Sequence, residues 1–276
     1  MTDSVAEADT AVGNIASARP FSTFERLVAW RYLRARRKES VVSVIAAFSF
    51  IGIMLGVAAL IVVMAVMNGF RSELITRILG INGHMIVQMI DGPMKGYADM
   101  ADRFAKVPGV KFAIPFVDGQ VLAQGKGGNN SGALVRGIRA DDLAKLKLVS
   151  DNIREGDLVG FASGDGILIG SRLAQELGVE AGDSITLLSP DGDVTPMGIN
   201  PRVKSYKVAA TYEIGMSEYD SSIIFMPFEE AQLFFNADGI AQSIEVFIDH
   251  PDTVDEMRPL IEKAAGNQIF ITDWRQ

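Results

Sequence analysis

An uncharged apolar run from Val41 to Met67 constrains the fold of this chain more than any other stretch. It contains no Asp, Glu, Lys, Arg or His, and fifteen of its residues are Val, Ile, Leu or Phe. Each such residue favours insertion into a bilayer by roughly 0.3 to 0.6 kcal/mol. As a helix rising about 1.5 Å per residue, the run is roughly 40 Å long, which is enough to cross a hydrocarbon core of about 30 Å with some tilt. The sequence therefore predicts a transmembrane helix, to which we assign residues 40–68.

Two other interpretations of this run fit less well. A buried core helix rarely exceeds about 20 residues and rarely lacks polar residues on every face. A cleaved signal peptide has an apolar region about half as long, and here the run begins only near residue 41 with no small-x-small site after Met67. We therefore expect the membrane span to be retained in the protein.

Basic residues are concentrated on the N-terminal side of the apolar run. Residues 19–39 carry seven of them, Arg19, Arg26, Arg31, Arg34, Arg36, Arg37 and Lys38, whereas the net charge of the whole chain is −8. Because basic flanks stay in the cytoplasm, we expect a cytoplasmic N-terminus and a C-terminal part on the opposite side of the membrane. The acidic balance of that part disfavours binding of nucleic acid.

The segment before the span divides into a tail and a basic helix. Residues 1–20 are small, polar and without pattern, which predicts a disordered cytoplasmic tail. In residues 21–39, Ser22 and Glu25 form a capping box at the start of a helix with an aromatic side and an Arg cluster. This helix suits the inner leaflet, where Arg31, Arg34, Arg36, Arg37 and Lys38 would meet membrane lipid. An equally good interpretation is a basic flank that only fixes the topology.

Small residues within and after the span indicate helical neighbours. Gly52 and Gly56 form a G-x-x-x-G pattern, which lets another membrane helix approach closely. After Asn68 and Gly69, the apolar spacing remains helical, so we expect a helical stalk over residues 69–84.

From residue 85 to 276 the pattern becomes mixed, with short strands and helices separated by Gly and Pro. We predict an α+β domain without a second membrane span. The predicted strands are Met85–Ile90, Phe112–Gln124, Ala133–Ile138, Gly166–Ile169, Ser184–Leu188, Val203–Ile214, Ser221–Met226, Ser243–Ile248 and Gln268–Thr272. The predicted helices are Tyr97–Val107, Asp141–Leu148, Ser171–Leu177, Phe228–Phe235 and Thr253–Ala265.

The sequence contains no recognisable catalytic, cofactor or metal motif. The glycine clusters match neither phosphate-binding fingerprint, and both are better explained as turns. His84 and His250 lack carboxylates at ligand spacing, and there is no cysteine. The segment starting at Asp191 and Asp193 departs from a calcium loop at its glycine and terminal Glu positions. We therefore expect no catalytic residue, no metal and no cofactor, although scattered Ser and Asp leave a membrane-anchored hydrolase or sensor as a remote alternative.

A proline-rich segment at about residues 190–203, PDGDVTPMGINPRV, is the most informative part of the soluble domain. Three prolines and two glycines predict a loop that cannot join a sheet ladder and that projects from the domain. Its apolar centre suits a docking site for a partner. In the other interpretation the loop folds back, and Met197 and Ile199 complete the core. The candidate partner-binding residues are Pro196, Met197, Gly198, Ile199 and Pro201.

Several blocks of this sequence together resemble the N-terminal part of the LolC and LolE permeases of lipoprotein-releasing ABC transporters. They are FERLVAWRYLRARRKES, the span ending in GVAALIVVMAVMNGF, the following ELITRILG, the stretch GILIGSRLAQELGVEAGDSITLLSP and the TPMG of residues 195–198. The resemblance covers roughly residues 21–276 and extends to the wider superfamily that includes MacB and FtsX. It implies a two-lobed, MacB-like periplasmic domain after the first of four membrane helices. Since the chain has one span, we expect it to be truncated before the second helix.

The resemblance also implies a function and a set of partners. The expected protein is a non-catalytic permease subunit in the bacterial inner membrane, working with a LolD-type ATPase subunit and a second permease subunit. It would release lipoproteins and pass them to a LolA-type periplasmic carrier, with the segment around Pro196, Met197 and Gly198 as the hook that recruits the carrier. The alternative is a MacB-like or FtsX-like mechanotransmission permease that acts on another periplasmic partner. The sequence does not distinguish LolC-like from LolE-like subunits.

Overall fold

The computed structural model describes residues 23–34, 40–195, 198–266 and 269–275. The chain divides into two units, Met1–Phe70 and Arg71–Gln276. The described residues of the N-terminal part form the helices α1 (Thr23–Arg34) and α2 (Ser40–Leu79). Within the described residues, one helical segment, Val42–Leu79, is long and apolar enough to cross a membrane. The large apolar side chains of α2 from Val42 to Phe70 are exposed, as a lipid-facing helix requires.

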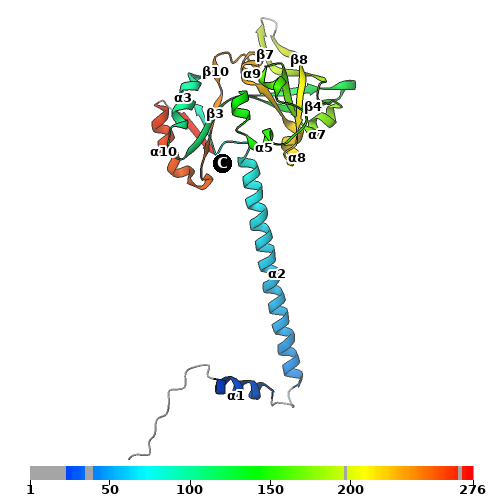
Figure 1. Ribbon diagram of the computed structural model, residues 1–276, viewed down its shortest axis with the longest axis vertical. Helices are drawn as coiled ribbons and strands as arrows, with labels where there is room; N and C mark the ends of the chain where they lie inside the picture. The colour runs from blue at the N-terminus through cyan, green and yellow to red at the C-terminus, as the bar shows by residue number, and fades with distance from the viewer. Residues whose placement is uncertain (1–22, 35–39, 196–197, 267–268, 276) are drawn as a thin grey trace, which may run out of the picture. The chain divides into compact units, whose positions relative to one another are not determined.

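The second unit is built on a ten-stranded mixed sheet (Figure 1). Its strand order is β12-β1-β11-β3-β4-β9-β6-β8-β5, and β7 pairs with both β3 and β8. The strands are β1 (Met85–Met89), β2 (Met94–Lys95), β3 (Val110–Gln124), β4 (Asn130–Ile138), β5 (Ile153–Gly156), β6 (Gly166–Gly170), β7 (Ser184–Thr195), β8 (Gly198–Tyr212), β9 (Ile223–Pro227), β10 (Ile240–Ala241), β11 (Ser243–Ile248) and β12 (Ile269–Asp273). Strands β2 and β10 form a separate two-stranded ladder.

Helices pack on the sheet toward both of its ends. They are α3 (Tyr97–Ala105), α4 (Ala140–Leu143), α5 (Lys147–Ser150), α6 (Val159–Ala162), α7 (Ser171–Leu177), α8 (Ser217–Ser222), α9 (Phe228–Phe234) and α10 (Val254–Ala265), with 3-10 turns η1 (Lys126–Gly128) and η2 (Pro251–Thr253). In Figure 1, α3 and α10 lie at one end of the unit, and α7, α8 and the β7–β8 pair lie at the other.

The long strand β3 joins these two ends into one sheet. Its first half pairs with β11, from Val110 to Phe116, and its second half pairs with β4, from Val117 to Gln124. We call the part around β1, β11, β12, α3 and α10 the first lobe, and the part around β4 to β9 and α7 to α9 the second lobe. Because β3 is part of both lobes, a displacement of either lobe would also move the backbone of β3.

Three apolar clusters hold the unit together. One packs α3 and α10 on the first lobe, with Phe104 and Ile261 fully buried. The second cluster packs α7 and α9 on one face of the sheet in the second lobe. The third cluster, which includes Phe161 and Tyr212, lies on the opposite face. Burial of each large apolar side chain contributes about 1.5 to 3 kcal/mol, so these clusters supply most of the driving force for folding.

The predicted α+β class is confirmed, and most predicted elements match observed ones within a few residues. The single helix predicted at Asp141–Leu148 is wrong, because the chain forms two short helices on either side of Leu146. Leu146 leaves the helical region, with ψ of 78°, and buries its side chain. The strand predicted to begin at Ser221 starts at Ile223, since residues 217–222 form α8. The two-residue strands β2 and β10 and the four-residue β5 were too short to give a periodic pattern.

Candidate partner-binding hairpin

The proline-rich segment forms the end of a β-hairpin. Strands β7 and β8 pair from Ser184↔Lys207 to Ser189↔Arg202, and pairing resumes at Asp193↔Asn200 and continues to Thr195↔Gly198. The prediction that this segment cannot join a sheet ladder is therefore wrong. Pro190 and Pro201 lie where the register shifts, and a bulge tolerates residues that lack an N–H donor.

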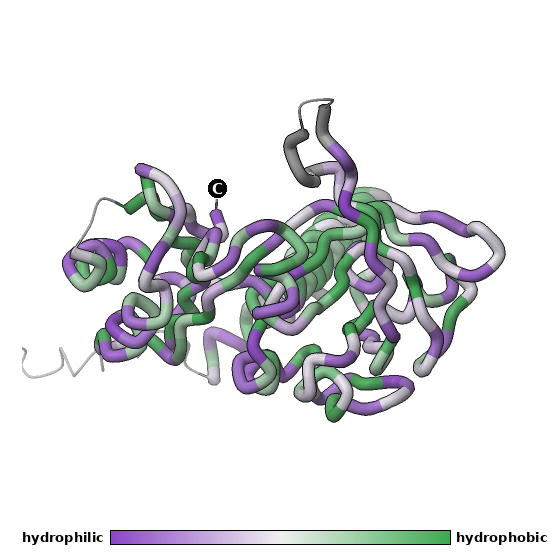
Figure 2. Tube along the Cα trace, turned by 90° about the horizontal axis from the view of Figure 1, so that it is seen from above, coloured by the Kyte–Doolittle hydropathy of each residue, from purple (hydrophilic) through white to green (hydrophobic). Residues whose placement is uncertain are grey.

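Beyond Leu188, β7 has no partner strand other than β8 among the described residues. Residues 189–195 and 198–202 thus form an extension of the two strands past the rest of the sheet, which we call the distal hairpin (Figures 1 and 2). An isolated pair of strands has little intrinsic stability, so contacts at its base determine how firmly it is held.

The strands approach closely at Gly192. A Cβ atom built on Gly192 would lie 1.6 Å from the carbonyl oxygen of Asn200, a distance that no side chain can accommodate. Glycine is therefore required where the register shifts, because it lets the bulged strand pass close to its partner.

The predicted partner-binding residues fall on this hairpin or outside the described residues. Gly198 and Ile199 are the first residues of β8 and pair with Thr195 and Val194, and Pro201 is exposed on the same strand. Pro196 and Met197 lie outside the described residues. The structure thus brings Gly198, Ile199 and Pro201 together on one strand of the distal hairpin.

Two side chains on β8 connect the base of the hairpin to α9. Lys204 Nζ lies 2.6 Å from Glu230 Oε1, and the Tyr206 hydroxyl donates to the same oxygen at 2.7 Å. Burial and the bond to Glu230 raise the pKa of Tyr206, so its hydroxyl remains a donor at all ordinary pH values.

A further contact between β8 and α9 was missed by sequence analysis. The Arg202 guanidinium donates to the carbonyl oxygens of Leu233 and Phe234 and to the Asn236 amide oxygen. No sequence pattern indicates this contact, because Arg202 and its acceptors are about thirty residues apart.

A second polar assembly lies inside the unit, just after α2. Arg136 on β4 forms an ion pair with Glu245 on β11, and both side chains are under 5% exposed. Glu245 also accepts the backbone N–H of Gly83 at 2.6 Å, and Arg136 donates to Asn82 at 3.2 Å. We call Asn82, Gly83, Asp118, Arg136 and Glu245 the buried cluster.

Charge balance within the buried cluster depends on Arg136. Its Nε atom lies 3.5 Å from Asp118 Oδ1, and its guanidinium carbon lies 4.1 Å from the centre of the Phe116 ring. Burial raises the pKa of Glu245, whereas the neighbouring Arg136 charge lowers it. One cation therefore stabilises carboxylates from both lobes and also contacts the segment that leaves α2.

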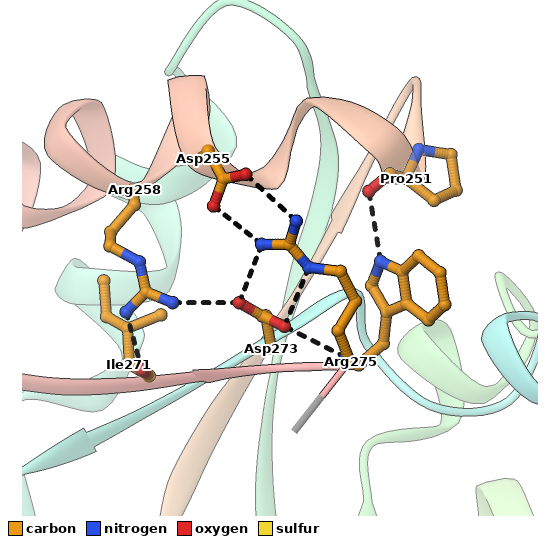
Figure 3. A network of polar contacts seen from close by, with 7 residues as sticks. Pro251, Asp255, Arg258, Ile271, Asp273 and Arg275 are labelled. Carbon is orange, nitrogen blue, oxygen red and sulfur yellow. Dashed lines mark hydrogen bonds and ion pairs between the residues drawn. The ribbon is translucent and has the colours of Figure 1, made fainter.

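An ion network around the buried Asp273 side chain fastens the end of β12 to α10 (Figure 3). Asp273 accepts hydrogen bonds from Arg258 at 3.0 Å and from the Arg275 side chain and backbone. Arg275 also forms a bidentate pair with Asp255, and the Trp274 indole donates to the Pro251 carbonyl. Hydrogen bonds from Arg275 hold the pKa of Asp273 below its usual value.

The remaining predicted site residues lie in the N-terminal helices. Gly52 and Gly56 are exposed in α2, and a Cβ atom added at either one would meet no atom within 4 Å. Arg31 is exposed in α1 and Arg34 is its last residue, while Arg36, Arg37 and Lys38 lie outside the described residues. Among the described residues, no three His, Asp or Glu side chains gather in a way that could hold a metal ion.

Comparison with known proteins gives consistent results. Residues 46–264 match the family described as the MacB-like periplasmic core domain. The chain is 30% identical to LolC, a lipoprotein-releasing system transmembrane protein of Neisseria meningitidis serogroup B, over 91% of this chain and 61% of that protein. Its identity is 32% to LolC of Xylella fastidiosa (92% of this chain, 61% of that protein) and 30% to LolE of Haemophilus influenzae (90% and 60%). The resemblance to LolC and LolE inferred from the sequence is thus confirmed.

The chain spans about 61% of the length of the LolC relatives. Among solved structures, the periplasmic region of MacB from Actinobacillus actinomycetemcomitans matches with a TM-score of 0.46 and 14% identity, covering 71% of this chain and 91% of that one. The extracellular domain of the transporter YknZ from Gram-positive bacteria matches with a TM-score of 0.45 and 14% identity, covering 70% of this chain and all of that one.

Proposed function

Because the chain belongs to the family of MacB-like periplasmic core domains, we propose that it acts as a permease subunit of a lipoprotein-releasing ABC transporter. In this proposal α2 crosses the bacterial inner membrane, the N-terminus is cytoplasmic, and residues 85–276 form the periplasmic domain. The relatives named LolC and LolE support this assignment. The helical stalk expected over residues 69–84 is shorter, because α2 ends at Leu79 and because Asn82 and Gly83 belong to the buried cluster. The subunit itself is not an enzyme, and a separate LolD-type subunit hydrolyses ATP.

The observation that carries this proposal is the distal hairpin. It extends past the sheet on β7 and β8, and its end carries the TPMG sequence at residues 195–198. A projecting strand pair with an apolar end is well suited to insert into a partner. We propose that Pro196, Met197, Gly198, Ile199 and Pro201 bind a LolA-type carrier, which receives the lipoprotein.

The membrane-facing residues have proposed roles as well. Gly52 and Gly56 present an open surface on α2, where a helix of this subunit or of a second, LolC-like or LolE-like permease subunit can pack. Arg31 and Arg34 on α1, with Arg36, Arg37 and Lys38 after it, contact membrane lipid on the cytoplasmic side.

A photo-crosslinking experiment tests the carrier assignment. A photoreactive residue replaces Met197, and the chain in detergent is irradiated with a purified LolA-type carrier. The same residue at Val159, which is 72% exposed on α6, serves as the control. We expect an adduct at Met197 and none at Val159. Absence of an adduct at Met197, while the carrier accepts lipoprotein from a complete transporter, would reject the hairpin as the docking site.

The family description itself favours a second candidate function. Because residues 46–264 match the MacB-like periplasmic core domain, we propose as the alternative a MacB-like or FtsX-like mechanotransmission permease that acts on another periplasmic partner, such as an efflux adaptor or a cell-wall hydrolase. Affinity purification from native membranes separates the two. Recovery of a LolD-type ATPase with a lipoprotein supports the first function, and recovery of an adaptor or a hydrolase supports the second.

A further inference from the structure

The register shift in the β7–β8 ladder leaves the distal hairpin attached at a narrow base. Ser189↔Arg202 is the last pair before the shift, and the three outer pairs join β7 and β8 to each other. A strand pair beyond such an irregularity bends easily, because the ladder is locally interrupted. The direction of the hairpin therefore depends on contacts made at residue 202.

Arg202 makes those contacts with the end of helix α9. Its Nη1 atom donates to the carbonyl oxygens of Leu233 at 2.6 Å and Phe234 at 3.0 Å, and Nη2 donates to Asn236 Oδ1 at 2.7 Å. The last carbonyls of a helix lack intrahelical partners and carry partial negative charge, so a cation there is favourable. The planar guanidinium reaches several acceptors at once, which a lysine ammonium does not do with the same geometry.

The end of α9 is itself shaped for this contact. Asn236 has a positive φ of 54°, and it is the one non-glycine residue with positive φ among those described. A left-handed residue after a helix ends the helix and turns the chain away. The backbone N–H groups of Phe235 and Ala237 bond the carbonyls of Ala231 and Gln232. Arg202 bonds the next two carbonyls. The side chain of Asn236 also accepts a hydrogen bond from Arg202.

Helix α9 is firmly fixed to both lobes. Gln232 donates to the Ile240 carbonyl at 2.8 Å and lies 3.4 Å from the Tyr97 hydroxyl at the start of α3. Phe228 packs on the Tyr97 ring with centroids 5.2 Å apart. Phe235, just after α9, lies against Gly119 of β3, where a Cβ atom would come within 2.2 Å of its ring. Helix α9 is thus a rigid support that connects the two lobes.

We propose that Arg202 is the positioning residue of the distal hairpin. By fastening β8 to the end of α9 at the register shift, it sets the direction in which the hairpin extends and couples that direction to both lobes. This inference rests on the proposed function, since it describes how the carrier-binding element is presented. A pre-oriented element binds with a smaller loss of conformational freedom than a mobile one.

The absence of cysteine from the sequence makes a direct test possible. A spin label is attached to Asn200→Cys, an exposed position on the distal hairpin, in the full chain in detergent, without any carrier. Its mobility is measured in the Arg202→Ala, Arg202→Lys and Arg154→Ala backgrounds. Arg154 is the control, because it forms an exposed ion pair with Glu213 in the same lobe. Thermal unfolding of each variant establishes that the domain is folded.

We expect Arg202→Ala to shorten the correlation time of the label at least twofold, Arg202→Lys to give an intermediate value and Arg154→Ala to leave it unchanged. Affinity for a purified LolA-type carrier should fall about three- to tenfold in Arg202→Ala, the loss expected when an ordered element becomes mobile. Unchanged label mobility in folded Arg202→Ala and Arg202→Lys chains overturns the inference, whatever the carrier does. Increased mobility in a chain that binds no carrier even as wild type supports the positioning role and rejects the proposed function.

Discussion

The distal hairpin is rich in proline, and the buried cluster is rich in charged residues. The two regions are attached to the rest of the domain in opposite ways. The hairpin has a narrow base, where Arg202 and the β7–β8 ladder attach it to the domain. The buried cluster joins β4, β11 and the segment after α2 through side chains that are almost fully buried. A change in the hairpin should therefore remain local, whereas a change in the buried cluster should affect the whole unit.

The physical reason for this difference is the cost of an unpaired charge. Removing one partner of a buried ion pair costs about 3 to 5 kcal/mol, because the remaining charge stays in a poorly solvated place. Exposed pairs contribute about 0 to 1 kcal/mol. The same substitution of an arginine thus has consequences that depend on burial more than on the number of contacts.

The largest effect is expected for Arg136→Met. Glu245 would keep only the N–H of Gly83 as a described partner and would lose its counter-charge, so the free energy of unfolding should fall by about 3 to 5 kcal/mol. Urea unfolding of the full chain in detergent, followed by tryptophan fluorescence, measures this loss. Arg154→Ala is the control, and its effect should stay within about 1 kcal/mol.

The double variant Arg136→Met with Glu245→Leu tests whether an unpaired charge causes the loss of stability in Arg136→Met. If unpaired charge is responsible, the double variant should be more stable than Arg136→Met alone. A loss below about 1 kcal/mol for Arg136→Met would contradict the assignment of the cluster as the joint between the two lobes.

The buried cluster could not be predicted from the sequence. Asn82 and Arg136 are 54 residues apart, and Arg136 and Glu245 are 109 apart, so no local pattern connects them. Each of these residues taken alone is typical of a solvated surface. Only the pairing of β3 with β4 on one side and β11 on the other brings them together.

The hairpin was predicted in part. Its apolar, proline-containing centre identified a candidate docking element, and the elements on either side of it follow their periodic patterns. Its conformation was predicted wrongly, because a proline excludes a residue from a regular ladder but not from a bulge. The register shift that accommodates Pro190 and Pro201 depends on the close approach at Gly192, which a sequence pattern does not reveal.

Substitution of Gly192 should disturb the hairpin without weakening the domain. In Gly192→Ala, the new methyl group would overlap the Asn200 carbonyl, so β7 and β8 must separate beyond Ser189. We expect at least tenfold faster amide hydrogen exchange in residues 193–195 and 198–200, with a change below about 1 kcal/mol in global unfolding. Hydrogen exchange measured by mass spectrometry gives both the local exchange rates in the hairpin and the free energy of global unfolding.

The control for this substitution is Gly132→Ala. Gly132 also lies in a strand, β4, but a Cβ atom there meets no atom within 4 Å. Its exchange pattern should match the wild type. Loss of global stability in Gly192→Ala comparable to that of Arg136→Met would show that the hairpin is part of the cooperative core.

Acidification should act on the region near the buried cluster before it acts on the hairpin. His84 follows Gly83 and is buried; burial and the nearby Lys111 lower its pKa to about 4. Its Nδ1 atom accepts the Ile248 N–H at 2.9 Å, so the native ring is neutral. Since the unfolded chain protonates this ring near pH 6.5, the unfolded state binds more protons between pH 6.5 and about 4, and stability falls across that range.

Urea unfolding of the full chain at several pH values measures this dependence. His84→Gln should flatten the decline between pH 6.5 and 4. A label on the distal hairpin should keep its mobility throughout. If the wild type and His84→Gln lose stability in parallel, titration of His84 does not cause the decline.

The smallest effect is expected for a substitution of Ser189, a buried polar residue at the base of the distal hairpin. Its side chain is fully buried at the base of the hairpin, and its Oγ atom has no hydrogen-bond partner among the described residues. A buried hydroxyl without a partner bears its desolvation cost without compensation. Ser189→Ala should therefore change the free energy of unfolding by no more than about 0.5 kcal/mol, and any change should be an increase in stability.

Ser205→Ala, which removes the exposed contact between Ser205 and Thr186, is the matched control and should give a slight loss of stability. A loss above about 1 kcal/mol for Ser189→Ala would mean that the hydroxyl is bonded in solution and that the base of the hairpin, like the buried cluster, depends on a buried polar contact.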